Sequence, residues 1–131
     1  MKSYVKFKMM MAIVLVVVLS LSSVGFAKGV SEYDQYLINA LKDKNIGVRA
    51  SAAQLLGDRR VQEAIKPLIK MLKSEKDYAC RIIAAKALYD IGDLKVLPLL
   101  KKVAKKDKNK TVRRVVTAIV QEMENVKVVK K

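Results

Sequence analysis

The stretch Asp43-Lys44-Asn45-Ile46-Gly47-Val48-Arg49 returns later in the chain as Asp107-Lys108-Asn109-Lys110-Thr111-Val112-Arg113, with five of the seven positions unchanged. A degenerate third copy, Asp77 to Arg81, lies halfway between them. As a result, Arg49, Arg81 and Arg113 are equally spaced along the chain. A fixed period of a few tens of residues is the signature of a repeat protein, in which each unit packs on the next. The sequence therefore predicts a stack of similar units.

Each copy of the motif leads into a segment with helical periodicity. Apolar residues recur at i, i+4, i+7 and i+8 from the residue before the arginine, which is the spacing of an apolar helix stripe. Gly57 and Gly92 follow the first two stripes, and glycine at this place closes a helix by adopting the left-handed conformation. The stripes consist of Val48, Ala52, Leu55 and Leu56, of Cys80, Ala84, Ala87 and Leu88, and of Val112, Val116, Ile119 and Val120.

A second kind of helix alternates with the first. The segments 36–42, 67–73 and 98–104 align at equal steps, and Pro67 and Pro98 lie in the first two turns, where a missing N–H matters least. No segment shows strand alternation long enough to compete. The sequence therefore predicts an all-α fold, a short right-handed α-solenoid of helical hairpins. We expect about six helices, over residues 31–42, 47–56, 61–73, 77–91, 94–106 and 110–125.

Two segments resemble HEAT repeats: Val48-Arg49-x-x-Ala52-Ala53-x-x-Leu56-Gly57-Asp58 and Arg81-x-x-Ala84-Ala85-x-Ala87-Leu88-x-x-Ile91-Gly92-Asp93. More closely, they resemble the short HEAT-like type that also occurs in phycobilisome lyases. The resemblance covers residues 31–124 and implies an interaction scaffold. It does not imply lyase chemistry, because an exported domain would not meet the phycobilisome. The third copy has Val115-Val116 in place of the alanine pair and no Gly-Asp, as expected of a terminal cap.

The N-terminal segment 1–27 has the pattern of a secretory signal peptide. Lys2, Lys6 and Lys8 precede an apolar run from residue 9 to 21, and Gly25 and Ala27 stand at positions −3 and −1 of a cleavage site. We therefore expect a signal peptide at 1–27, a HEAT-like domain at 28–131, and a periplasmic or secreted protein. The alternative is an uncleaved membrane anchor, because the charge-free stretch 9–27 is close to the shortest length that can span a bilayer.

The chain is strongly basic, with 27 Lys and Arg against 12 Asp and Glu and a net charge of +15. Cleavage after Ala27 removes three lysines and leaves a net charge of +12, which favours an acidic or anionic partner. The second-helix segments carry a lysine stripe, which in similar solenoids would line the concave surface as a basic groove. The alternative is a solvated face that keeps the protein soluble. The candidate partner-binding residues are Lys66, Lys70, Lys73, Lys101, Lys102 and Lys105.

The repeated arginines have two interpretations. They form either a row of anion-binding groups or a structural ladder in which each guanidinium pairs with an aspartate of an inter-repeat turn, and bidentate arginine geometry favours the ladder. Its predicted members are Arg49, Arg81 and Arg113 with Asp43, Asp77 and Asp107.

The sequence gives little support for catalysis. There is no histidine, no glycine-rich phosphate loop and no nucleophile elbow, and the single cysteine, Cys80, replaces an apolar stripe residue. We therefore predict no enzyme activity, no catalytic residue, no metal site and no cofactor, and we expect Cys80 to be buried.

These patterns favour a non-enzymatic scaffold that binds an acidic protein. The scarcity of aromatic residues and the expected export argue against nucleic acid. A membrane contact remains open, through an uncleaved N-terminus or through a basic surface on anionic lipid. Apolar ends at 33–41 and 115–123 can favour self-association.

Overall fold

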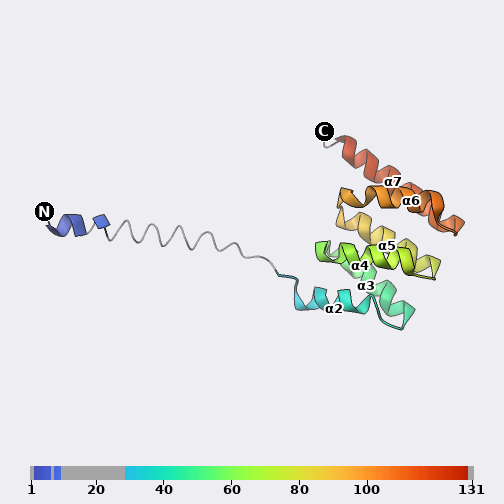
Figure 1. Cartoon of the computed structure of the whole chain (residues 1–131), viewed down its shortest axis with the longest axis horizontal. Coiled ribbons are helices and arrows are strands. Elements are labelled where there is room, and N and C mark those ends of the chain that lie inside the picture. The colour runs from blue at the N-terminus through green and yellow to red at the C-terminus, as the bar shows by residue number, and fades with distance from the viewer. Residues whose placement is uncertain (1, 7, 10–28, 130–131) are drawn as a thin grey trace.

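The computed structural model describes residues 2–6, 8–9 and 29–129, and these residues form helices and turns without a strand. From residue 29 onward the described chain contains six α-helices, which confirms the predicted all-α fold (Figure 1). They are α2 (Glu32–Ala40), α3 (Ile46–Asp58), α4 (Ile65–Ser74), α5 (Tyr78–Ile91), α6 (Leu97–Lys106) and α7 (Lys110–Val129). Short 3₁₀ turns at Gln62–Ala64 and Leu94–Val96 lead into α4 and α6.

The helices are arranged in two layers, as in a short helical solenoid. Figure 1 shows α2, α4 and α6 stacked in one layer, with α3, α5 and α7 behind them. In the second layer α3 packs against α5 and α5 against α7, while α2, α4 and α6 each pack against the helix that follows. This arrangement brings together the turns that carry the repeated motif along one edge of the stack.

Among the described residues, the core comes from these six helices and their connections. In this part of the chain, the buried apolar side chains run from Leu37 to Met123. Cys80 is 2% exposed, and burial raises the pKa of its thiol. The structure thus places Cys80 in the apolar core, as expected. The largest of the fully buried side chains are Leu56, Leu68, Leu72, Leu88, Leu100, Val112 and Val116.

The two glycines that were expected to close helices have different roles. Gly92 has φ +82° and ends α5 in the left-handed conformation, as predicted. Gly57 lies inside α3, and a Cβ atom there would stand 2.7 Å from the Cα of Ala87 on α5. The prediction for Gly57 was therefore wrong: this glycine lets α3 and α5 approach closely, and the left-handed residue after α3 is Arg60, with φ 53°.

The predicted signal peptide lies largely outside the described residues, so the boundary after Ala27 stays a prediction. None of the helices in the described parts of the chain has the length and apolarity needed to cross a membrane.

Candidate functional site

Three turns between the layers share one local structure, an acidic residue followed by lysine and then Asn or Asp. They are Asp43-Lys44-Asn45, Glu75-Lys76-Asp77 and Asp107-Lys108-Asn109. In each turn the acidic side chain accepts a hydrogen bond from the backbone N–H two residues later, at 2.7, 3.3 and 2.8 Å. The third residue caps the following helix, because its side-chain oxygen accepts N–H groups of the first turn.

Arg81, in the first turns of α5, links two of these turns. Its Nη1 donates to the carbonyl oxygens of Glu75 and Lys76 at 3.1 and 3.0 Å. Its Nε and Nη2 donate to both carboxylate oxygens of Asp107, each at 2.9 Å. Arg81 is only 4% exposed, and among the described residues it is the one buried charged side chain. A buried guanidinium is tolerated because its neighbours satisfy it with a carboxylate and two carbonyls.

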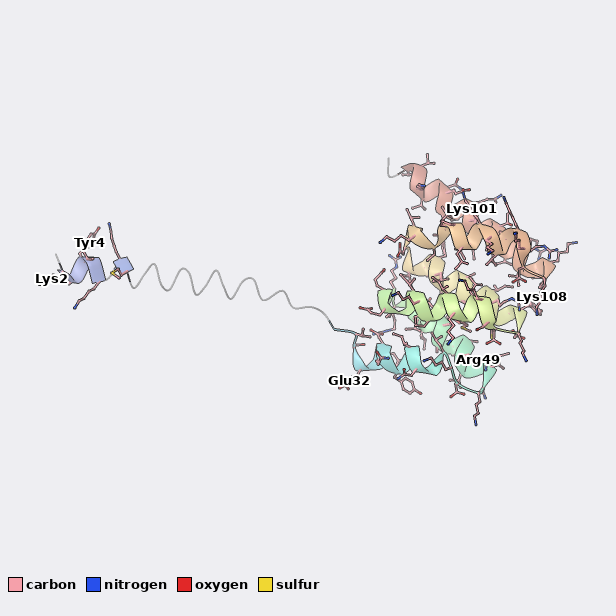
Figure 2. All side chains as sticks on the ribbon, in the orientation of Figure 1. Lys2, Tyr4, Glu32, Arg49, Lys101 and Lys108 are labelled. Atoms are coloured by element: carbon pink, nitrogen blue, oxygen red, sulfur yellow. The ribbon has the colours of Figure 1, made fainter. Side chains whose placement is uncertain are left out.

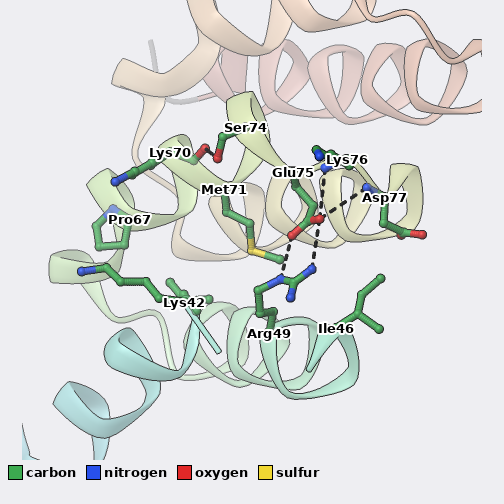
Figure 3. A pocket seen from close by; sticks show the side chains of 11 residues that line it. Lys42, Ile46, Arg49, Pro67, Lys70, Met71, Ser74, Glu75, Lys76 and Asp77 are labelled. Atoms are coloured by element: carbon green, nitrogen blue, oxygen red, sulfur yellow. Dashed lines mark hydrogen bonds and ion pairs between the residues drawn. The ribbon is translucent and has the colours of Figure 1, made fainter. Parts of the chain in front are cut away.

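Arg49 makes the same set of bonds one repeat earlier. Its Nη1 donates to the carbonyl oxygens of Asp43 and Lys44. Its Nε and Nη2 donate to the Glu75 carboxylate at 2.8 and 3.1 Å, as Figure 3 shows. These bonds from Arg49 hold the pKa of Glu75 below its usual range. We call Arg49, Arg81 and Arg113 the arginine ladder, and an arginine with its carboxylate a rung.

The acidic members of the ladder differ from the predicted set. Asp107 holds Arg81, but the Asp77 carboxylate caps α5, and Asp43 offers Arg49 its carbonyl rather than its carboxylate. The carboxylate partner of Arg49 is Glu75, which sequence reasoning missed. Its signal was present, because Glu75 lies at the midpoint of the sequence between Asp43 and Asp107.

The third arginine is placed differently. The Nη1 of Arg113 donates to the carbonyl oxygen of Asp107 at 2.7 Å, as its two equivalents do in their own turns. Among the described residues, however, no carboxylate forms an ion pair with Arg113. The ladder thus has two complete rungs and one arginine that holds only its own turn.

A groove of about 620 Å³ runs between α4 and α6, next to the Arg81 rung. Its apolar residues are Leu72, Leu99 and Val103. The two carboxylates on its edge, Glu75 and Asp107, are already held by ladder arginines. We call this the lysine groove, since five lysines line it: Lys73, Lys76, Lys102, Lys106 and Lys108.

A second groove of about 450 Å³ lies between α2 and α4 (Figure 3) and repeats the same layout one unit earlier. Its lining includes Lys42, Lys70 and Lys76 together with the Arg49 rung. The two grooves follow the front layer in register with the repeat.

The structure divides the six predicted partner-binding lysines. Lys73 and Lys102 line the lysine groove and Lys70 lines the second groove. Lys101 pairs with Glu124 of α7, while Lys66 and Lys105 are exposed and line neither groove. The predicted set did not include Lys76, Lys106 and Lys108, which also line the lysine groove. The signal for two of these was the middle position of the turn motif, which is lysine at 44, 76 and 108.

The two ends of the stack differ in polarity. Tyr33, Tyr36, Val48 and Leu55 expose 38–65% of their surface at the α2–α3 end, where Tyr33 and Tyr36 stack with ring centroids 6.4 Å apart. At the other end, the predicted apolar patch at 115–123 was wrong. Val116, Val120 and Met123 are buried, and α7 turns the polar residues Arg114, Thr117 and Gln121 to solvent.

Within the described residues, no three His, Cys, Asp or Glu side chains come together as a metal site. No curated protein matches the chain. The family model described as HEAT repeats matches residues 35–120, which is more than half of the chain and covers the helices that build both grooves and the ladder. The chain belongs to the HEAT repeat family.

Proposed function

We propose that this chain is an exported scaffold that binds an acidic segment of a partner protein in the lysine groove. HEAT repeats are commonly scaffolds for protein interactions. The observation that carries the proposal is the set of five lysines around an apolar floor between α4 and α6. Such a groove offers both charge and apolar contact to an extended acidic segment.

Among the described residues, no groove lysine forms an ion pair. Within the same part of the chain, Lys86 and Lys101 form ion pairs, and neither lines the groove. Glu75 and Asp107 are committed to Arg49 and Arg81, so they neutralise little of the lysine charge. One exposed lysine contact contributes about 0–1 kcal/mol, but several contacts to one segment act together.

The composition of the groove favours an acidic protein over a nucleic acid. No aromatic side chain lines it, and stacking on aromatic residues is the usual means of holding single-stranded nucleic acid. The stacked tyrosines lie at the opposite end of the array, on α2.

Export belongs to the proposal because the N-terminal pattern of charge, apolar run and small residues is that of a signal peptide. N-terminal sequencing of the protein recovered from its host tests whether the signal peptide is removed, and Lys28 is the expected first residue. A protein that keeps Met1–Ala27 supports the second candidate, a membrane-tethered adaptor whose basic surface contacts anionic lipid. Pelleting with phosphatidylglycerol vesicles at low and high salt separates the two.

The groove is tested by charge reversal with a matched control on the same helices. Lys73→Glu/Lys102→Glu changes two groove residues, whereas Lys66→Glu/Lys105→Glu makes the same change of charge outside the groove. Binding of a fluorescein-labelled octaglutamate peptide is measured by anisotropy. We expect the groove variant to raise Kd by at least about tenfold and the control by about threefold or less, through net charge alone. Equal losses in the two variants would refute the groove.

A further inference from the structure

The two complete rungs define how this fold holds a carboxylate. In both, Nη1 of the arginine is fixed by carbonyls of its own turn, and Nε and Nη2 grip both oxygens of a carboxylate in the next turn, at 2.8–3.1 Å. The guanidinium is thus oriented by one half of its bonds and recognises a planar anion with the other half.

Arg113 makes one of the two carbonyl bonds of this arrangement and lacks its carboxylate half. Its Nη1 is held by the Asp107 carbonyl oxygen at 2.7 Å, and no described carboxylate lies within ion-pair distance of its guanidinium. In the inner repeats the residue after the arginine packs against the core, as Ile82 does on α5. On α7 the equivalent residue is Arg114, which is exposed. The side of α7 where a further rung would stand is therefore polar and open.

The charges around Arg113 favour an anion from outside. Lys106, Lys108 and Lys110 are exposed near it, and the acidic residue of its own turn, Asp107, is held by Arg81. Figure 2 places Lys108 and Arg49 toward the same edge of the stack, the edge along which the turns lie.

The repeat spacing connects Arg113 to the lysine groove. Packed helices lie about 8–10 Å apart, so Arg113 on α7 stands about 10 Å from Arg81 on α5, and Asp107, whose carbonyl oxygen holds Arg113, lines the groove. An extended segment covers this distance in about three residues. We infer that Arg113 binds the carboxylate of an Asp or Glu in the same acidic segment, as Arg49 and Arg81 bind Glu75 and Asp107. This inference rests on the proposed function and adds to it a bidentate anchor at the end of the ladder.

The test compares two neighbouring arginines in the full chain. Arg113→Lys keeps the charge but removes the fork, and Arg114→Lys makes the same change at the next residue, on the exposed side of α7. With the labelled octaglutamate peptide, which is long enough to reach from the groove to Arg113, we expect Arg113→Lys to raise Kd by about tenfold. Arg114→Lys should change Kd by about twofold or less. Both variants should keep the wild-type circular dichroism spectrum, because Arg113 supplies one hydrogen bond to the fold.

A second readout follows the Nε–H signal of Arg113 by NMR as peptide is added. Displacement of this signal, with the loss of affinity in Arg113→Lys, supports the inference. If these effects appear while Lys73→Glu/Lys102→Glu binds the peptide with wild-type affinity, the Arg113 anchor is supported and the groove is refuted. If the peptide binds but Arg113→Lys and Arg114→Lys have the same Kd, the anchor is refuted while the groove proposal is unaffected. A peptide that fails to bind the wild-type chain refutes both.

Discussion

Replacing Arg81 by methionine should be among the most damaging single changes in this stack. The substitution keeps much of the side-chain bulk but removes both bonds to Asp107 and both bonds to the carbonyls of Glu75 and Lys76. It leaves the Asp107 carboxylate, 10% exposed, with only the N–H of Asn109. Breaking a buried pair in this way costs about 3–5 kcal/mol, because an uncompensated charge remains.

The size of the loss is large for a domain of this length, which has about 5–15 kcal/mol of total stability. Each kcal/mol shifts the melting temperature by about 4–8 °C, so Arg81→Met should melt at least about 12 °C lower. Urea unfolding followed by far-ultraviolet circular dichroism gives the free energy directly. Arg113→Met, which removes one backbone hydrogen bond, should cost only about 0.5–1.5 kcal/mol.

A double substitution distinguishes the loss of the Arg81–Asp107 pair from other destabilising effects of the methionine. Adding Asp107→Asn to Arg81→Met removes the stranded charge, so the double variant should be less destabilised than the sum of the two single variants. Strict additivity, or a cost for Arg81→Met no larger than for Arg113→Met, would refute the claim that the rung holds adjacent repeats together.

Two further changes test the packing and the charge of the stack. Gly57→Ala places a Cβ 2.7 Å from the Cα of Ala87 and should destabilise the domain by about 1–3 kcal/mol, whereas Gly29→Ala, with no atom within 4 Å, should be neutral in the same urea titration. Hydrogen bonds from Arg49 lower the pKa of Glu75 in the folded state, so their stabilisation is complete above the unfolded pKa near 4.5 and is lost as the pH falls through the lower folded value. Stability should therefore fall below about pH 5, and Glu75→Gln should be less sensitive to acid over this range; identical pH profiles would argue against the Arg49 rung.

The helical architecture could be predicted because it depends on periods that appear in the sequence itself. The apolar periodicity located the six helices from α2 to α7 to within a few residues, and the segment after residue 125 continues α7 to Val129. Gly57 was assigned the wrong role because a glycine before the end of a stripe suits both a helix cap and a close helix contact. Only the position of Ala87 decides between them.

The candidate site was less predictable, because it depends on how one helix lies beside another. Lys102 and Lys105 are both on α6, yet only Lys102 lines the groove. Lys101, on the same helix, forms an ion pair with Glu124 of α7. Glu75 escaped notice because the aspartate two residues later matched the motif by residue type. In the structure Glu75 has the ladder role and Asp77 the capping role.

The central claim is that an acidic segment occupies the lysine groove, and NMR mapping of the bound peptide tests it most directly. Octaglutamate is titrated into the ¹⁵N-labelled chain at low salt, and shifted amides are placed on the structure. The account predicts that the largest shifts cluster at Lys73, Lys102 and Lys108, along the groove between α4 and α6. Shifts spread evenly over all exposed lysines, or concentrated at the α2–α3 end around Tyr33 and Tyr36, would contradict it.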